Sequence, residues 1–335
     1  MKELLQPIEI GGLKLNNRLV MPPLATYLAT PEGQVTEPLL DYYDQRARGG
    51  EIGLIFTEHS FISRQGQAKA KQLSIASDDD VAGLKRLTDV IHQAGAKAFA
   101  QLNHAGSAAV TADSGLPAVS ASPVPLPVTP ALGDGNLPEE ASAEQIGRIT
   151  GEFAAAAKRA KLAGYDGVEI HCAHGYLLNQ FYSPLTNRRT DAYGGGLENR
   201  MRFLLEAVAA VRKAVGDFYP ISVRLGGCDY MEGGSTIDDA VRASALLERA
   251  GVDLLSLSGG MCRFTRPGHT EAGYFGDMSG AVRRNVSIPV LIAGGVKTAE
   301  EAEQLLDAGL ADLIGVGRAL MKDPRWAEKA LASLA

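Results

Sequence analysis

The stretch Asp166-Gly-Val-Glu-Ile-His-Cys-Ala-His-Gly-Tyr176 follows an alanine-rich segment, residues 157–163, and starts with a turn-forming Asp-Gly pair. The alternating Val and Ile residues after that turn predict a strand, so the region has the helix-to-strand junction that is typical of parallel sheets. His171 and His174 lie where this strand gives way to a loop, and Tyr176 follows them. The stretch therefore predicts a parallel α/β fold with two imidazoles and a phenol at one edge of the sheet.

The same strand-then-helix pattern occurs eight times along the chain, which predicts a closed (β/α)8 TIM barrel. A doubly wound open sheet has the same local pattern and is the alternative fold. Three helix starts have the spacing of a capping box, at Ser142, Thr236 and Thr298. The predicted strands cover residues 17–24, 52–56, 96–102, 166–171, 221–225, 253–257, 289–293 and 312–316. The first predicted helix begins at residue 36, and the others cover residues 80–93, 142–162, 197–215, 237–250, 278–284, 299–308 and 324–334.

Two segments lie outside this repeat. Residues 8–15 place Gly11 and Gly12 between two short alternating runs, which predicts a hairpin that closes one end of the barrel. Residues 110–140, after the third strand, are rich in proline and glycine, which predicts a long loop without regular elements. That loop is expected either to shape the substrate entrance on the catalytic face or to be a plain surface excursion. We expect residues 1–335 to form one domain.

The composition is that of a folded globular protein, because 45% of the 335 residues are hydrophobic and 21% are charged. The formal net charge is −6 and no block of Lys or Arg is present, which argues against nucleic acid as a partner. No apolar run has the length of a signal peptide or a membrane span, so we expect a cytoplasmic enzyme. Cys172, Cys228 and Cys262 are far apart and odd in number, which favours reduced thiols over disulfides.

Glycines follow the last two predicted strands, at Gly294 and Gly295 and again at Gly317, where Arg318 comes next. In TIM barrels the loops after strands seven and eight commonly bind phosphate, because their backbone N–H groups are unobstructed. The glycines permit close approach of a ligand and the guanidinium can pair with its charge. The sequence therefore predicts a phosphate site made by these two loops.

A polar run dense in Arg, Asp, Asn and Tyr continues from His171 to Phe203, and we expect its own ion pairs and hydrogen bonds to order it. It contains His-x-x-His-Gly-Tyr at 171–176, Ser-Pro at 183–184, Asn187, Arg189, Asp191, Tyr-Gly-Gly at 193–195, Glu-Asn-Arg at 198–200 and Arg-Phe at 202–203. This spacing resembles the signature of the old yellow enzyme family of FMN-dependent ene-reductases.

The resemblance implies an enzyme that binds FMN noncovalently, takes hydride from NADH or NADPH, and reduces the C=C bond of a small electron-poor alkene such as an α,β-unsaturated carbonyl compound. It implies that His171 and His174 hold the substrate carbonyl, that Tyr176 donates the proton, and that Tyr27 lines the substrate pocket. The positions that match the family's flavin contacts are Pro23, Leu24, Ala25, Gln101 and Arg224, and its phosphate contacts match Gly294, Gly295, Gly317 and Arg318.

Arg224 lies in an otherwise apolar predicted strand, where a buried cation is costly without an anionic partner. A reduced flavin supplies such a charge in the family, and a structural ion pair is the alternative. Two positions depart from the family pattern. Ala25 stands where most relatives have a Cys or Thr donor, and we expect His59, on the adjacent strand, to contact the cofactor in its place. Ser107 stands where many relatives have Arg.

Other functions are compatible with the same residues. The chain also resembles the barrel of 2,4-dienoyl-CoA reductases, whose iron–sulfur segment and dinucleotide-binding domain we do not expect here. A barrel that reduces flavin for a partner protein is a second alternative. The third is a metal-dependent hydrolase or aldolase, in which Glu58 or His59 joins the two histidines as a ligand. We predict no metal, and a homo-oligomer is left open.

Overall fold

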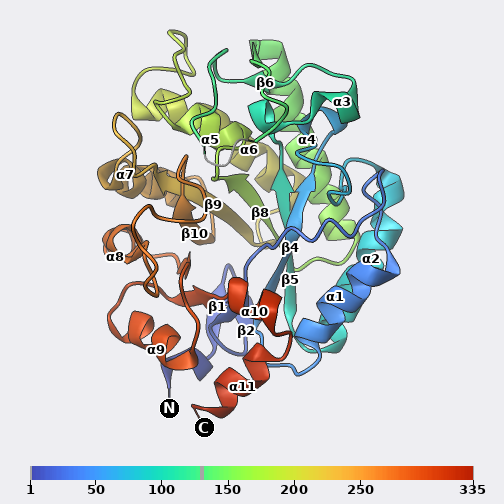
Figure 1. The fold of residues 1–335 in the computed structure, drawn as a ribbon, viewed down its shortest axis with the longest axis vertical. Coiled ribbons are helices and arrows are strands. Elements are labelled where there is room, and N and C mark those ends of the chain that lie inside the picture. Colours follow the sequence, from blue (N-terminus) through green and yellow to red (C-terminus); the bar gives the residue numbers. More distant parts are fainter. Residues whose placement is uncertain (1, 129–131, 335) are drawn as a thin grey trace.

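The computed structural model describes residues 2–128 and 132–334, and its central feature is a closed barrel of parallel strands (Figure 1). The strands are hydrogen-bonded around the barrel in chain order, as the predicted (β/α)8 barrel requires, so the open-sheet alternative is wrong. They are β3 (Leu19–Met21), β4 (Leu54–Phe61), β5 (Lys97–Asn103), β8 (Gly167–Cys172), β9 (Ile221–Cys228), β10 (Leu254–Gly259), β11 (Val290–Ala293) and β12 (Leu313–Gly315).

Helices surround the barrel, with α1 and α2 on one side and α7, α8 and α9 on the other (Figure 1). All three predicted capping boxes are present, because the side chains of Ser142, Thr236 and Thr298 each accept a backbone N–H three residues on. Within the described residues no helix is long and apolar enough to cross a membrane. The main helices are α1 (Glu37–Ala47), α2 (Val81–Gln93), α4 (Ala143–Leu162), α6 (Leu197–Val215), α7 (Ile237–Arg249), α8 (Gly276–Arg283), α9 (Ala299–Asp307) and α11 (Trp326–Ala332).

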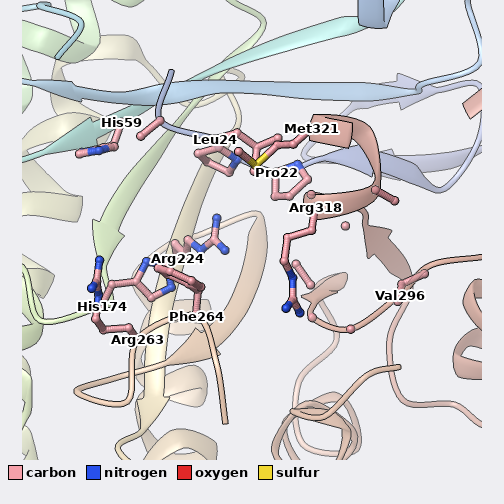
Figure 2. Close-up of a pocket in the computed structure, with 18 of the residues that line it drawn as sticks. Pro22, Leu24, His59, His174, Arg224, Arg263, Phe264, Val296, Arg318 and Met321 are labelled. Carbon is pink, nitrogen blue, oxygen red and sulfur yellow. The ribbon is translucent and has the colours of Figure 1, made fainter. Parts of the chain in front are cut away.

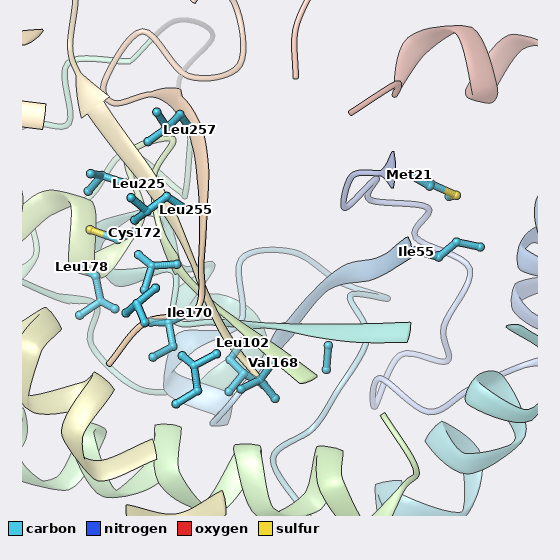
Figure 3. Packing of buried hydrophobic residues seen from close by; sticks show 14 of the residues in the cluster. Met21, Ile55, Leu102, Val168, Ile170, Cys172, Leu178, Leu225, Leu255 and Leu257 are labelled. Carbon is cyan, nitrogen blue, oxygen red and sulfur yellow. The ribbon is translucent and has the colours of Figure 1, made fainter. Parts of the chain in front are cut away.

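The outer face of the barrel is apolar and packs against these helices (Figure 3). Along β8, for example, Val168, Ile170 and Cys172 are fully buried in the large cluster that joins strands to helices. The residues between them, Glu169 and His171, face the barrel interior, since successive side chains of a strand point to opposite sides. Strand alternation thus separates the packing surface from the functional interior.

The predicted hairpin is confirmed as β1 (Ile8–Ile10) paired with β2 (Leu13–Leu15). Ile10 and Leu15 pack against the ends of the strands inside the barrel, so the hairpin plugs one mouth. Gly11 and Gly12 form the turn with positive φ angles of 53° and 86°, which glycine adopts without strain. The interior residues that the hairpin meets are Val20, Leu54, Phe56, Phe99, Leu254, Leu291 and Leu313.

Several elements differ from the sequence-based prediction. The second barrel strand continues to Phe61 rather than ending at Phe56, with a register shift between Thr57 and Ser60 that marks a bulge. Two short helices, α5 (Leu177–Tyr182) and α10 (Arg318–Lys322), were not predicted. Each begins a few residues after a barrel strand ends, where tertiary packing rather than local pattern decides the course of the chain.

The expectation that residues 110–140 contain no regular element is also wrong. The insertion includes α3 (Thr111–Ser114) and a parallel pair, β6 (Val119–Ser120) with β7 (Glu139–Glu140). Residues 129–131 of this loop lie outside the described part of the chain. Proline and glycine prevent long elements here, but they leave room for short ones that close the base of the loop.

We predict that Ile10→Ala lowers the free energy of unfolding by about 2–5 kcal/mol, because it opens a cavity where the hairpin plugs the barrel. Ile10 has no exposed surface, whereas the neighbouring Glu9 is exposed on the same strand. Glu9→Ala is therefore the matched control and should change stability by less than about 0.5 kcal/mol. Denaturant unfolding measures both, and equal stability of the two variants would contradict the plug.

Candidate active site

A cavity of about 750 Å³ opens at the carboxyl ends of the barrel strands (Figure 2). Its size suits a cofactor or substrate pocket. Every site residue predicted from the sequence lines this one cavity, although the residues come from loops that are far apart in the chain. These residues are Pro23, Leu24, Ala25, Tyr27, His59, Gln101, His171, His174, Tyr176, Arg224, Gly294, Gly295, Gly317 and Arg318.

The end of the cavity beyond β11 and β12 is a backbone cradle. A Cβ at Gly295 would lie 2.0 Å from the Glu271 carbonyl oxygen, and one at Gly294 would lie 2.7 Å from the Tyr274 ring, so only glycine fits at either position. Arg318 lies beside this cradle, and its Nη2 donates to the Tyr274 hydroxyl at 3.3 Å. Arg318 forms no ion pair within the described residues, so its charge is available to an anion such as a phosphate.

The floor of the cavity is a layer of buried polar groups inside the barrel. The Glu169 carboxylate accepts hydrogen bonds from Gln101 Nε2 at 2.8 Å and from the Ser222 hydroxyl at 3.0 Å. Burial nevertheless raises the pKa of Glu169 above its usual range. Gln101 uses one amide hydrogen on this carboxylate, which fixes the orientation of its side chain toward the cavity. Gln101 is thus held ready to bond a ligand that has both donors and acceptors.

Arg224 is the cation of this layer, and it is 5% exposed. Its Nε atom is buried without a hydrogen-bond partner, and among the described residues no carboxylate lies within 4 Å of its guanidinium. Burial therefore lowers the pKa of Arg224, while the more distant Glu169 charge raises it. The alternative of a structural ion pair is not realised in the described part of the chain. The geometry leaves a buried positive charge facing the cavity, which an anionic ligand would stabilise.

Two imidazoles and a phenol meet at the other end of the cavity. The ring centroids of His171 and His174 are 5.1 Å apart, and the centroid of Tyr176 is 5.1 Å from that of His171. Burial lowers the pKa values of both histidines well below their usual range, so the rings are neutral near pH 7. Burial also raises the pKa of Tyr176 to about 12, which keeps the phenol protonated. The group therefore offers hydrogen-bond donors without a net charge of its own.

Each histidine is held differently. The Nε2 of His174 lies 2.8 Å from the Ser258 hydroxyl, and its backbone has a positive φ of 62°, which is uncommon for a residue other than glycine. His171 makes no side-chain hydrogen bond within the described residues, and its Nδ1 is buried without a partner. Such an unpaired buried group is costly unless a ligand or water completes it, so His171 is positioned to bond a ligand.

His59 lies in the bulge of β4 and stacks on Tyr176 with a centroid distance of 5.4 Å. Gln72 donates from Nε2 to His59 Nδ1 at 2.9 Å, while Gln72 Oε1 accepts the Ala68 N–H at 2.7 Å. Because Nδ1 is an acceptor, the ring proton sits on Nε2. Burial, with a contribution from Arg224, lowers the pKa of His59 to about 4. A third neutral imidazole with one free N–H therefore lines the cavity.

Glu58, the neighbour of His59, fixes the loop that leaves β3. Its carboxylate accepts hydrogen bonds from the backbone N–H and the hydroxyl of Thr26, the latter at 3.1 Å. Tyr27 follows with a positive φ of 56° and lines the cavity. Burial raises the pKa of Glu58 to about 7 despite these bonds. The strained Tyr27 backbone is held by a buried carboxylate from the next strand.

Several residues of the 171–203 motif prove to be structural. Asn187 Nδ2 donates to the carbonyl oxygens of Phe181 and Tyr193, at 2.7 and 2.8 Å. Arg189 pairs with Asp191 and also bonds the Ala141 carbonyl at 2.8 Å, which ties the motif to the end of the 110–140 insertion. The expectation that this run is ordered by its own polar contacts is confirmed.

The cavity also has residues that the sequence-based reasoning missed. Arg263 and Phe264 come from the loop between β10 and α8, and Tyr274 comes from the same loop. Their position after a barrel strand was the available signal, since loops at the carboxyl ends of strands line barrel sites. The further lining residues are Pro22, Thr270, Ala293, Val296, Lys297, Gly315, Ala319, Met321, Lys322, Asp323 and Trp326.

The alternative of a metal site finds no support in the side-chain positions. Within residues 2–128 and 132–334, no three His, Cys, Asp or Glu side chains are grouped as ligands for a metal ion. Glu58, one of the predicted third ligands, uses its carboxylate on Thr26. His59 uses its Nδ1 on Gln72. Neither side chain joins the two histidines in a ligand set.

Comparison with known proteins agrees with this geometry. The family described as NADH:flavin oxidoreductase / NADH oxidase matches residues 3–335. The chain is 42% identical over 327 residues to an NADH oxidase of Thermoanaerobacter brockii, a match that covers 96% of this chain and 49% of that protein. A solved 2-naphthoyl-CoA reductase complex superposes with a TM-score of 0.89 and 27% identity, over 99% of this chain and 52% of the other.

An old yellow enzyme homologue from Zymomonas mobilis superposes with a TM-score of 0.84 and 30% identity, covering 98% of this chain and 93% of that one. The chain thus spans about half the length of the NADH oxidase and of the naphthoyl-CoA reductase, and nearly the whole length of the Zymomonas protein.

We predict that Glu58→Gln removes a pH dependence of stability. The folded protein keeps the Glu58 proton up to about pH 7, whereas an unfolded chain loses it near the usual pKa of 4.5, so rising pH destabilises the wild type across this window. The stability of the wild type relative to the variant should fall by about 3 kcal/mol between about pH 4.5 and 7. Denaturant unfolding at both pH values measures this change. Glu32→Gln, at an exposed carboxylate, is the control, and a pH-independent difference between wild type and Glu58→Gln would contradict the assignment.

Proposed function

This chain belongs to the NADH:flavin oxidoreductase / NADH oxidase family, and we propose that residues 1–335 form one FMN-binding barrel that reduces activated alkenes. The hydride comes from NADH or NADPH, and the acceptor is the C=C bond of an α,β-unsaturated carbonyl compound. One observation carries the proposal. A single cavity has a phosphate cradle at one end, an unpaired buried cation in the middle, and neutral imidazoles with a protonated phenol at the other end.

The residues present fit FMN. Gly294, Gly295 and Gly317 with Arg318 would hold its phosphate, and Gln101 would meet the polar edge of its ring. Arg224 would meet the negative charge that the reduced ring carries, and its buried Nε, which has no partner among the described residues, supports this role. When bound, FMN supplies the transfer of hydride between the nicotinamide and the substrate carbon.

His171 and His174 then hold the substrate carbonyl. Neutral imidazoles donate hydrogen bonds to the carbonyl oxygen and stabilise the negative charge that develops on it, in the manner of an oxyanion hole. The unpaired Nδ1 of His171 and the fixed ring of His174 suit this role, because both are positioned before a ligand arrives. The low pKa values of the two rings keep them from adding a positive charge beside the Arg224 guanidinium.

Tyr176 donates the proton that completes the reduction at the α-carbon. Its hydroxyl makes no hydrogen bond to the protein within the described residues, so it is free to bond the substrate. The raised pKa of about 12 keeps it protonated throughout the physiological range. The stacked His59 ring on one side and His171 on the other fix the direction of the phenol.

A second candidate function keeps the cofactor and changes the acceptor. The chain spans only 49% of the length of the NADH oxidase that it matches. One such barrel would oxidise NAD(P)H and pass the electrons to another domain or a partner protein. Another would act on enoyl thioesters, as the 2,4-dienoyl-CoA reductases do. Both would need the same cradle. Rapid reduction of a simple enone by this chain separates alkene reduction from electron transfer to a partner.

We predict that Tyr176→Phe slows reduction of the alkene by about 10²–10⁴-fold and leaves reduction of the flavin by NAD(P)H nearly unchanged, because only the first needs a proton at carbon. Stopped-flow absorbance at the flavin band measures both half-reactions after the purified protein is loaded with FMN. Tyr193→Phe removes a phenol outside the cavity and is the control. Equal slowing of both half-reactions would contradict the role of Tyr176, and failure to bind FMN would contradict the proposed function.

We further predict opposite effects of Ala25→Thr and His59→Ala on the flavin midpoint potential. A new hydroxyl at position 25 would donate to the reduced ring and raise the potential, whereas loss of the His59 Nε2–H would lower it. Both residues line the cavity, and the tautomer of His59 leaves that N–H free. Potentiometric titration measures both shifts. Unchanged potentials in both variants would show that neither residue lies beside the flavin.

A further inference from the structure

The cavity holds more positive charge than FMN requires. Among its described lining residues, Arg224, Arg263, Lys297, Arg318 and Lys322 are cations, and one carboxylate opposes them. That carboxylate, Asp323, is paired outside the cavity with Lys329 at 2.6 Å. The three histidines of the cavity are neutral, and the whole chain has a net charge of −6. An acidic protein has therefore concentrated positive charge in one pocket, which attracts anionic ligands.

The three arginines among these cations divide along the length of the cavity (Figure 2). Arg318 lies at the glycine cradle and Arg224 lies in the middle of the cavity, and the phosphate and ring of FMN account for both. Arg263 lies at the opposite end from Arg318, next to His174 and Phe264 (Figure 2). That is the end where the imidazoles and Tyr176 would bind the substrate, so the flavin does not account for the charge of Arg263.

The Arg263 guanidinium has no ion-pair or hydrogen-bond partner among the described residues. Within the described residues it forms no ion pair, and its Nε is buried without a hydrogen bond. The guanidinium lies 5.1 Å from the centroid of the Phe264 ring, and that ring in turn lies 6.0 Å from the His174 ring. The Arg263 backbone has a positive φ of 63°, and its N–H bonds the Gly260 carbonyl at 2.9 Å. A strained loop thus holds an uncompensated cation against the substrate end of the cavity.

Arg266, three residues later in the same loop, shows the ordinary arrangement. It pairs with Asp277 at 3.0 Å and donates to the Tyr274 carbonyl at 2.9 Å. It does not line the cavity. The loop is therefore able to supply an arginine with an ion pair and a hydrogen bond, whereas among the described residues the Arg263 side chain has neither. The charge of Arg263 also acts on the residues of the site. It helps burial to lower the pKa of His174, and it partly offsets the effect of burial, which raises the pKa of Tyr176.

We propose that Arg263 binds a negatively charged group of the substrate, so that the enzyme prefers α,β-unsaturated carbonyl compounds that carry a carboxylate or a phosphate. This inference rests on the proposed function, since it places the substrate against His171 and His174. A guanidinium binds either anion through two parallel hydrogen bonds, and Phe264 offers an apolar surface to the carbon chain beside it. The same chemistry would suit the pyrophosphate of the nicotinamide dinucleotide, and the test separates these two sources.

The test compares matched ligands that differ chiefly in charge. The substrates are 4-oxopent-2-enoate and its methyl ester, and the binding probes are 4-hydroxybenzoate and 4-hydroxybenzamide, followed by the change in flavin absorbance of the FMN-loaded protein. The wild type should prefer the anion of each pair. Arg263→Gln should lower kcat/KM for the acid and weaken 4-hydroxybenzoate binding by about 10- to 100-fold, the value of a charge-assisted hydrogen bond, with little change for the neutral partners.

Two further variants keep the result interpretable. Arg263→Lys keeps the charge without the planar fork and should retain part of the preference, which also guards against misfolding of Arg263→Gln. Arg266→Gln removes a nearby charge that has protein partners and should leave the preference of the wild type intact. Raising the salt concentration should shrink the wild-type preference, because screening weakens the attraction.

Three results would overturn the proposal. Equal loss for acid and ester would mean that Arg263 only shapes the loop. A loss confined to flavin reduction by NADH or NADPH would assign the charge to the dinucleotide. If the wild type did not prefer either anionic ligand over its neutral partner, Arg263 would have no role in binding the charged group of the substrate. A different result would contradict the proposed function and not the role of Arg263. In that case the wild type would fail to reduce the methyl ester but would still bind 4-hydroxybenzoate more tightly than 4-hydroxybenzamide.

Discussion

The buried charge of Arg224 is the main constraint on the half of the barrel that contains the carboxyl ends of the strands and the cavity. A guanidinium that is 5% exposed, with an unpaired Nε and no carboxylate within ion-pair distance in the described chain, is costly in a medium of low dielectric constant. Glu169 supplies distant compensation only, since its oxygens are taken by Gln101 and Ser222. The apoprotein therefore carries an unfavourable term that an anionic ligand removes, which couples the stability of the barrel to occupancy of its cavity.

The same logic explains why the histidines are uncharged. Three imidazoles line a cavity that already contains five cations, and burial together with the Arg224 charge lowers each pKa. Neutral rings still carry one N–H each, so the site offers hydrogen-bond donors without net charge and leaves the charge to the arginines. A site built on protonated histidines would add repulsion to a pocket that has one carboxylate. The arrangement separates hydrogen bonding, done by imidazoles, from charge neutralisation, done by guanidinium groups.

The barrel, its hairpin plug, its capping boxes and the membership of the old yellow enzyme family were all predicted from the sequence and are confirmed. Those features depend on local pattern, such as alternation in a strand or the Ser142 cap, or on spacing within one motif. Reasoning from the sequence failed where distant contacts decide. The β4 strand runs past Phe56 because Ser60 and Phe61 pair with β5 beyond the bulge. Arg263 was missed although it follows a barrel strand, because its own segment does not show that its guanidinium lacks an ion pair among the described residues and lines the cavity.

Backbone strain marks the parts of the site that the barrel itself does not determine. Of the non-glycine residues with positive φ in the described chain, Tyr27, His174 and Arg263 line the cavity. They follow β3, β8 and β10, so three separate loops enter the site through an unfavourable conformation. Hydrogen bonds hold each of these loops. The Tyr27 loop bonds Glu58 through Thr26, His174 bonds the Ser258 hydroxyl, and the Arg263 N–H bonds the Gly260 carbonyl. The strands and glycines thus build the cradle, whereas the held loops bring Tyr27, His174 and Arg263 into the cavity, and such loops are where barrels of one fold differ most.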